Sequence, residues 1–139
     1  MLRLFVYGTL KPDESAYPHY CEPYVTTAQT ACMRGELFHL PQGYPAMTSG
    51  DRWITGALLR FHQEDAIARI DEFEDYDPTR PAAANLYERV VQPVFSTTHQ
   101  PLGAAWVYLM SAQRVQTLGG VRVASGEWSQ AAFGENEPF

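Results

Sequence analysis

The chain has 139 residues, of which 45% are hydrophobic and 13% aromatic, a composition typical of a globular protein and unlike that of disordered chains. Its formal net charge of -6 and its single lysine argue against a nucleic-acid partner and against a polybasic membrane patch, because both need clustered positive charge. A chain of this length buries about two-thirds of the surface that it exposes when unfolded, so we expect one domain over residues 1–139 that needs no disulfide and no structural metal.

The first half of the chain is predicted to contain three strands and one short helix. Gly8 ends the first apolar run, and a short helix is expected near Ser15–Cys21. The dense turn formers of residues 41–45 predict a loop between the second and third strands. The three strands are expected at residues 2–7, 30–40 and 53–61.

The second half is predicted to contain one clear helix followed by a pair of strands. Apolar residues recur at helical spacing over Glu64–Phe73, and residues 76–86 form a loop rich in Pro, Ala and Asn. The β-rich runs 87–96 and 102–110 predict a hairpin or two neighbouring strands. The segment from Ser111 is mixed, and its last few residues are expected to be loose. This order, without regular strand–helix alternation, favours an α+β fold with a mixed sheet that can curl into a barrel.

The cysteines and the N-terminus indicate a cytoplasmic protein. Cys21 and Cys32 form neither a C-x-x-C pair nor a zinc spacing, so we expect two buried free thiols, with a single disulfide as the alternative. Residues 1–7 lack the long apolar segment and the cleavage site of a signal peptide, and no apolar stretch is long enough to cross a bilayer. We therefore expect no membrane partner.

Glu74 is the acidic residue of the predicted helix that points toward its apolar side. At about 100° per residue, it falls within the arc of the apolar residues Ala66, Ile67, Ile70 and Phe73. The other acids of this segment fall outside the arc and are expected to face solvent: Asp65, Asp71, Glu72 and Asp75. Burial raises the pKa of a carboxyl group toward neutrality, where it suits a general acid or base.

Two structural roles compete with a catalytic role for Glu74. In the first, the helix ends at Phe73 and Glu74 turns out into solvent. In the second, Glu74 forms a salt bridge with Arg80 or Arg89, which would satisfy a buried carboxylate without any chemistry.

The tetrapeptide Tyr7-Gly8-Thr9-Leu10 follows the first strand directly and is a candidate anion-binding loop. Gly8 lets a ligand approach the backbone, successive N–H groups can form an anion-binding concavity, and Thr9 adds a hydroxyl. The alternative is an ordinary turn. Other chemistries lack their motifs: the sequence has neither a G-x-S-x-G elbow nor a phosphate loop, and its histidines show no metal-ligand spacing. The acidic run 71–77 lacks the glycine of a calcium-binding EF-hand loop.

Several short motifs occur together in a fixed order. They are Tyr7-Gly8-Thr9-Leu10, Gly35-Glu36-Leu37-Phe38, Gly43-Tyr44-Pro45-Ala46, a strand containing Gly56, Ile70-Asp71-Glu72-Phe73-Glu74, and Leu86-Tyr87-Glu88-Arg89-Val90. Over roughly residues 2–110 this ordered set resembles the γ-glutamylcyclotransferase-like family, which includes the γ-glutamylamine cyclotransferases and AIG2-like proteins.

The resemblance implies a small mixed β-barrel with flanking helices. It also implies an enzyme that releases 5-oxoproline from a small γ-glutamyl substrate, without metal or cofactor. By position, Glu74 matches the family's acid/base glutamate, and Tyr87 matches the tyrosine that begins the next strand. Asp75 stands where glycine often follows that glutamate, and Ile70 stands where leucine is usual. The substrate-cradling loop of the family matches Tyr7, Gly8, Thr9 and Leu10.

Two other functions stay open. A binding module would hold a similar ligand in the same pocket without turning it over. An interaction domain would present its acidic face to a partner and would have no pocket around Glu74. The sequence indicates neither the leaving group of the reaction nor the oligomeric state.

Overall fold

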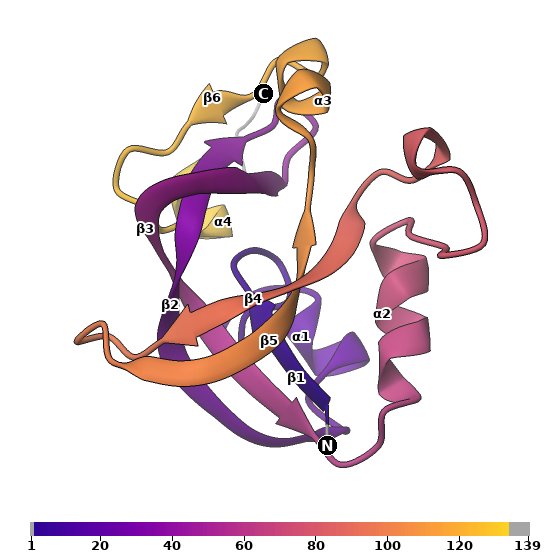
Figure 1. Ribbon diagram of the computed structural model, residues 1–139, viewed down its shortest axis with the longest axis vertical. Coiled ribbons are helices and arrows are strands. Elements are labelled where there is room, and N and C mark those ends of the chain that lie inside the picture. Colours follow the sequence, from indigo (N-terminus) through magenta and orange to yellow (C-terminus); the bar gives the residue numbers. More distant parts are fainter. Residues whose placement is uncertain (1, 134–139) are drawn as a thin grey trace.

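The computed structural model describes residues 2–133, which form a mixed six-stranded sheet with short helices around it (Figure 1). The strands are β1 (Leu2–Val6), β2 (Val25–His39), β3 (Pro45–Phe61), β4 (Glu88–Phe95), β5 (Pro101–Leu109) and β6 (Val121–Arg122). The helices are α1 (Tyr17–Tyr20), α2 (Ala66–Phe73), α3 (Ala112–Thr117) and α4 (Gln130–Phe133), with a single 3-10 turn at Ala82–Ala84. The expectation of a loose C-terminal end falls on residues outside this range.

The sheet curls toward a barrel because β3 pairs on both of its edges. The strand order is β3-β1-β5-β4-β2-β6, and β3 also pairs with β2. The β1–β5 pair is parallel, whereas the remaining pairs are antiparallel. Between β2 and β4 the register is the single pair Cys32↔Phe95, so closure there is partial. The predicted α+β fold with a mixed, barrel-like sheet is confirmed.

The predicted strands exist, but β2 and β3 are longer than the sequence pattern indicates. β3 begins at Pro45, inside the segment expected to be a loop, and runs through the polar residues 48–52. A proline is tolerated as the first residue of a strand because no ladder hydrogen bond is required there. The two ends of this stretch pair with β2, Thr48 with Glu36 and Arg52 with Gly35, and residues 49–51 lie in a shift of the register between these pairs.

Strand β1 is buried on both faces and supplies two separate apolar cores. Leu4 and Val6 belong to one cluster, which also contains Ile70 of α2. Phe5 and Tyr7 belong to the other, which contains the fully buried Trp128. Because side chains alternate along a strand, an apolar run without alternation fits a strand covered on both sides. Tyr7 continues this alternation, and Gly8 follows as the chain turns away.

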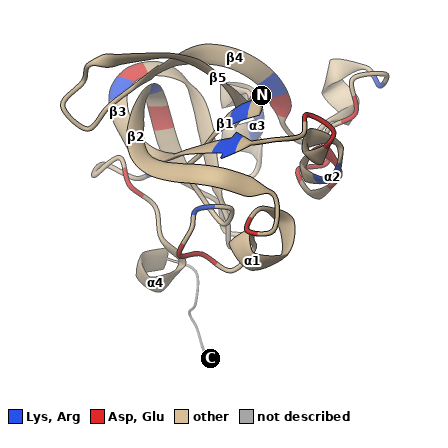
Figure 2. Ribbon diagram, turned by 90° about the horizontal axis from the view of Figure 1, so that it is seen from below, with Lys and Arg blue, Asp and Glu red and all other residues tan. Residues whose placement is uncertain are grey.

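Helix α2 stands beside the barrel, outside its strands (Figure 1). It starts at Ala66, two residues later than predicted, and ends at Phe73 as predicted. Ile70 is fully buried, but Phe73 is 38% exposed and contacts the ring of Tyr20, with ring centroids 4.5 Å apart. The helix therefore covers the barrel with only part of its apolar arc. Figure 2 shows acidic positions gathered along α2.

The cysteine prediction is confirmed, since Cys21 and Cys32 are both buried and not disulfide-bonded. Within residues 2–133, no helix is both long enough and apolar enough to span a membrane.

Candidate active site

A cavity of about 410 Å³ opens where the end of β1 meets the end of α2. Its volume falls within the range of small-molecule sites, roughly 300–1,000 Å³. Its wall contains all six site residues that the sequence indicated: Tyr7, Gly8, Thr9, Leu10, Glu74 and Tyr87. The remaining wall residues come from the end of β1, the turn before β3, the end of α2, the segment before β4, and β5: Phe5, Val6, Gly43, Tyr44, Pro45, Phe73, Leu86 and Tyr108. The interaction-domain alternative predicted no pocket here and is therefore wrong.

Glu74 caps the C-terminus of α2 and contributes to the cavity wall. Its amide donates to the carbonyl oxygen of Ile70 over 2.9 Å, which keeps the residue on the helix although its backbone has left helical geometry. Burial, and secondarily the charge of Asp71, raise the pKa of the Glu74 carboxyl to about 8. The residue as a whole is only partly buried, as suits a side chain that opens onto a cavity. Such a carboxyl can give and take a proton near neutral pH.

Both structural alternatives for Glu74 fail. The guanidinium of Arg80 pairs with Asp75 over 3.1 Å, and that of Arg89 pairs with Asp71 over 2.9 Å. Each arginine is therefore engaged by a neighbouring acid. The helix does end at Phe73, but Glu74 lines the cavity and is not turned out into bulk solvent.

Three of the four tyrosines that line the cavity donate their hydroxyl protons to acceptors within the protein. Tyr7 donates to the carbonyl oxygen of Tyr108 over 2.7 Å. Tyr87 donates to the carbonyl oxygen of Pro45 over 2.7 Å. The hydroxyl of Tyr108 donates to Oδ1 of Asp71 over 2.6 Å. The three rings thus supply apolar wall, which desolvates the cavity's carboxyl group, and their protons are directed elsewhere.

Burial also raises the pKa of each of these tyrosines, and the charge of Glu74 raises them further. They are therefore neutral over the whole pH range in which Glu74 titrates. Tyr87 directly precedes β4, which begins at Glu88, so the sequence placed it one residue too far into the strand.

Asp71 was expected to face solvent, and that prediction is wrong. The residue is 8% exposed and its carboxylate contacts both Arg89 and Tyr108. On the helical wheel it lies only about 40° beyond Ile67, at the edge of the apolar arc. The β4–β5 hairpin packs against this edge and presents an arginine and a tyrosine, which compensate the buried charge. A wheel cannot indicate this, because the partners lie on another element.

The loop after β1 offers unused backbone donors. Among the hydrogen bonds of residues 2–133, none has the amide of Gly8, Thr9 or Leu10 as its donor. The loop is held by its carbonyls instead, since Lys11 donates to Gly8 over 3.0 Å and Ala16 donates to Thr9 over 3.0 Å. Three adjacent amides without an internal acceptor are suited to bind an anion at the cavity wall.

The packing of the chain requires a glycine at position 8. A β-carbon at this position would lie 2.5 Å from Cγ of Pro45, far inside van der Waals contact. The absent side chain therefore lets the turn before β3 close against the loop after β1. These two segments form adjoining parts of the cavity wall.

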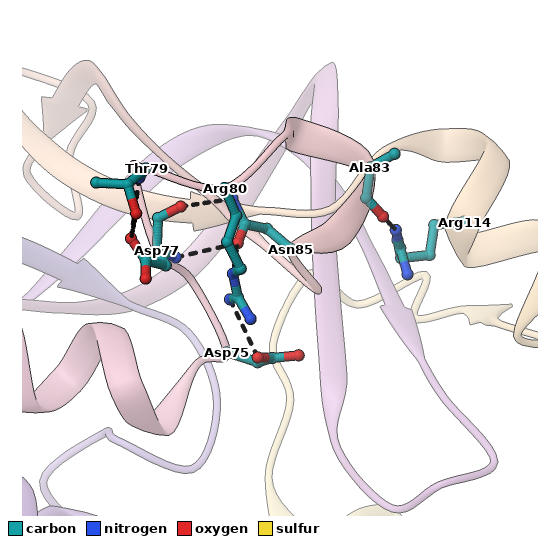
Figure 3. A network of polar contacts seen from close by, with 7 residues as sticks. All are labelled: Asp75, Asp77, Thr79, Arg80, Ala83, Asn85 and Arg114. Atoms are coloured by element: carbon teal, nitrogen blue, oxygen red, sulfur yellow. Dashed lines mark hydrogen bonds and ion pairs between the residues drawn. The ribbon is translucent and has the colours of Figure 1, made fainter.

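Asp75 adopts the backbone conformation that favours glycine. Its φ of 55 lies in the left-handed region, which explains why a glycine suits this position after the helix. Its carboxylate is directed to Arg80 and the side chain is 58% exposed (Figure 3). The like charge that Glu74 senses is that of Asp71, and Asp75 is turned away toward its own arginine.

The loop between α2 and β4 is fixed by a polar network around Asn85 (Figure 3). The side-chain oxygen of Asn85 accepts from the amide of Asp77 over 3.0 Å and from Nε of Arg80 over 2.9 Å. The amide of Leu86 donates to the carbonyl oxygen of Asp75 over 3.0 Å. This network sets the position of Leu86, which lines the cavity and was not among the predicted site residues.

Tyr108 is the cavity residue for which the sequence carries the least signal. It lies in the interior of β5, and its place beside Tyr7 depends on the parallel pairing Leu4↔Trp106 between β1 and β5. Glu74 is the one charged side chain among the described residues of the cavity wall. Within residues 2–133, no group of three or more His, Cys, Asp or Glu residues is arranged to hold a metal ion.

The chain was compared with protein families, with curated proteins and with solved structures. A family model described as gamma-glutamyl cyclotransferase, AIG2-like, matches residues 4–130. No curated protein matches the chain.

Solved structures share the fold at low sequence identity. YkqA from Bacillus subtilis superposes with a TM-score of 0.65 at 22% identity, over 91% of this chain but only 39% of YkqA. An AIG2-like protein from Mus musculus superposes with a TM-score of 0.61 at 21% identity, over 79% of this chain and 77% of the mouse chain. YtfP from Escherichia coli superposes with a TM-score of 0.60 at 23% identity, over 91% of this chain and 96% of YtfP.

Proposed function

The chain belongs to the gamma-glutamyl cyclotransferase, AIG2-like family, and from this membership and the cavity we propose that it is a cofactor-free cyclotransferase. The reaction releases 5-oxoproline from a small γ-glutamyl amide, whose leaving group is an amine or an amino acid. The observation that carries the proposal is the Glu74 carboxyl, which lines the cavity with a pKa raised to about 8. The buried free thiols of Cys21 and Cys32 support activity in a reducing compartment such as the cytoplasm.

A γ-glutamyl amide carries its own nucleophile, the α-amine. The enzyme must hold the substrate curled so that this amine reaches the γ-carbonyl carbon, and proximity alone supplies a large part of the rate. The free amides of Gly8, Thr9 and Leu10 bind the α-carboxylate, the oxyanion of the γ-carbonyl, or both. The described wall offers no basic side chain for these negative charges, so backbone donors take that role.

Glu74 moves the proton. In its ionised form it removes a proton from the α-ammonium, and the freed amine attacks the γ-carbonyl carbon to form the ring C–N bond. As the bond between the γ-carbon and the departing nitrogen breaks, Glu74 delivers that proton to the departing nitrogen. The ring nitrogen loses its second proton and the released amine takes one up, so the products are 5-oxoproline and a protonated amine. The apolar walls keep water from competing for the proton.

A pure binding module has no use for a carboxyl group whose pKa is raised to about 8, whereas a group that takes up and returns a proton needs such a pKa. This argument favours the enzyme over the binding alternative. The rings of Tyr7, Tyr87 and Tyr108 serve the proposal as walls that position the substrate. Their hydroxyl protons are already donated within the protein.

The test is incubation with a panel of γ-glutamyl amines and γ-glutamyl amino acids, with 5-oxoproline measured by mass spectrometry. We expect turnover of at least one member and a loss of about 10²–10⁴-fold in Glu74→Gln, the contribution typical of a general acid or base. Glu72→Gln is the matched control, because Glu72 is on the same helix and exposed. A folded Glu74→Gln variant with full activity excludes the mechanism. Wild-type protein that binds the panel in calorimetry but forms no 5-oxoproline is the binding module.

A further inference from the structure

Asp71 is a buried carboxylate one helical turn before Glu74. Residues three apart on a helix are neighbours, with β-carbons roughly 5–6 Å apart. The Asp71 side chain is 12% exposed, so its charge acts through protein more than through water. Its charge is the second cause, after burial, of the raised pKa of Glu74.

The Asp71 carboxylate is fixed by two residues of the β4–β5 hairpin. Nε of Arg89 lies 2.9 Å from Oδ1, and the hydroxyl of Tyr108 donates to the same oxygen over 2.6 Å. Arg89 is itself held between two rings, with its guanidinium carbon 4.3 Å from the ring centre of Trp106 and 5.4 Å from that of Tyr76. The arginine forms an ion pair with Asp71, and the two rings hold the guanidinium in place.

We propose that Asp71 is a positioning residue that holds the Glu74 carboxyl in its protonated form around neutral pH and so sets the pH above which Glu74 acts as a base. Its role in turnover rests on the proposed cyclotransferase function. Asp71 lies outside the cavity wall and acts through Glu74. The arrangement places an aspartate that is paired with an arginine one helical turn from a carboxyl that forms no ion pair among residues 2–133.

The other titratable groups that face Glu74 stay neutral in this pH range. Burial raises the pKa of Cys21, which follows α1, to about 12. It also raises the pKa of Tyr7 at the end of β1, of Tyr87 before β4 and of Tyr108 on β5. The fixed charges beside Glu74 are therefore those of the Asp71–Arg89 pair. Asp75, next to Glu74 in sequence, is paired with its own arginine.

The experiment follows the titration of the Glu74 carboxyl carbon by NMR in protein labelled with carbon-13 glutamate, assigned by its loss in Glu74→Gln. We expect a wild-type midpoint near pH 8, as the raised pKa indicates. In Asp71→Asn the midpoint is expected to fall by roughly one pH unit, since a like charge is removed. Asp75→Asn is the matched control and leaves the midpoint in place. Asn also tolerates the left-handed backbone of this position.

The double variant Asp71→Asn/Arg89→Met keeps the proposal testable if Asp71→Asn alone does not fold. It removes both charges and leaves no unpaired buried ion, which is the change that such sites tolerate best. We expect the midpoint to fall here too, by less than in Asp71→Asn, because the positive charge is also gone. The acid limb of the kcat/KM profile should move with the NMR midpoint, a shift that a merely structural residue would not cause.

The outcomes separate the two proposals. A Glu74 midpoint that stays in place in both Asp71 variants, or that moves equally in Asp75→Asn, overturns the role of Asp71 whatever the activity. A wild-type protein that forms no 5-oxoproline overturns the proposed function, while the titration still decides whether Asp71 holds the proton on Glu74.

Discussion

The hydroxyl of Tyr7 donates a hydrogen bond to the carbonyl oxygen of Tyr108 over 2.7 Å and joins the end of β1 to β5 at the cavity wall. The same hydroxyl accepts from the amide of Met47 in β3 over 3.3 Å. One buried side chain thus connects three strands that meet at the cavity. The family motif Tyr7-Gly8-Thr9-Leu10 therefore contains a structural tyrosine as well as a loop that is free to bind an anion.

Tyr7→Phe is expected to lower the free energy of unfolding by about 1–3 kcal/mol, because a buried donor and acceptor lose their partner. Urea unfolding measures the change. Tyr24→Phe is the control, since Tyr24 is 40% exposed and its hydroxyl accepts a solvent-exposed hydrogen bond from Arg69. It is expected to change the unfolding free energy by less than about 0.5 kcal/mol. Equal losses in the two variants would contradict the structural role of Tyr7.

Gly8→Ala is expected to destabilise the protein by about 1–3 kcal/mol, as overpacking typically does, and to raise KM for any γ-glutamyl substrate. The added β-carbon would meet Cγ of Pro45 at 2.5 Å and push the two cavity loops apart. Adding Pro45→Ala removes the opposing ring atoms, so the double variant should recover part of the loss in a double-mutant cycle. If the losses of stability in the two single variants simply add up in the double variant, the clash with Pro45 is not the reason for a glycine at position 8.

The position of Glu74 was predictable because a local rule, the helical wheel, places it on the apolar side of α2. The helical wheel failed for Asp71. This residue lies just outside the apolar arc, yet residues of β4 and β5 bury it. Whether a borderline acid is buried depends on what the neighbouring element presents. Here that element carries Arg89 and Tyr108, about 18 and 37 residues further along the chain.

The limits of strand prediction have a similar cause. Residues 48–52 carry no apolar alternation, and they fall within β3 because β2 pairs with Thr48 and Arg52 on either side of a register shift. Tyr108 joins the cavity through the parallel β1–β5 pairing, which connects residues about one hundred positions apart. Local propensity specifies elements, whereas such pairings depend on the whole barrel. Local patterns could not predict that the separate motifs lie around one cavity. The resemblance to a family predicted this.

Asp75 stands where relatives often have a glycine, and its backbone conformation predicts why a glycine suits this position. With φ of 55, the position strains any residue with a β-carbon, and Asp tolerates it better than Ala does. Asp75→Gly is expected to be more stable than Asp75→Ala by about 1 kcal/mol in thermal or urea unfolding. Both variants lose the same exposed ion pair with Arg80, so the comparison isolates the backbone. Equal stability of the two would contradict this reading of the helix end.

The raised pKa of Glu74 predicts how stability depends on pH. The carboxyl has its ordinary pKa of 4.5 in the unfolded chain and a pKa of about 8 in the folded protein. Below the lower value both states are protonated, and Glu74 imposes no penalty. Between the two values the folded state keeps a proton that the unfolded state releases, so the free energy of unfolding falls as pH rises. Above about 8 both states are ionised and the penalty is constant.

Glu74→Gln removes this titration and should therefore become more stable than the wild type as pH rises. In urea unfolding from about pH 5 to about pH 9, the advantage of the variant is expected to grow and to reach roughly 1–3 kcal/mol at the alkaline end. Glu72→Gln, whose carboxyl is exposed, should differ from the wild type by a constant amount. An advantage of Glu74→Gln that stays flat or shrinks with pH would mean that the carboxyl is ionised throughout. Such a carboxyl could not return a proton to the departing nitrogen near neutral pH, because the proton transfer requires a group that is readily protonated there.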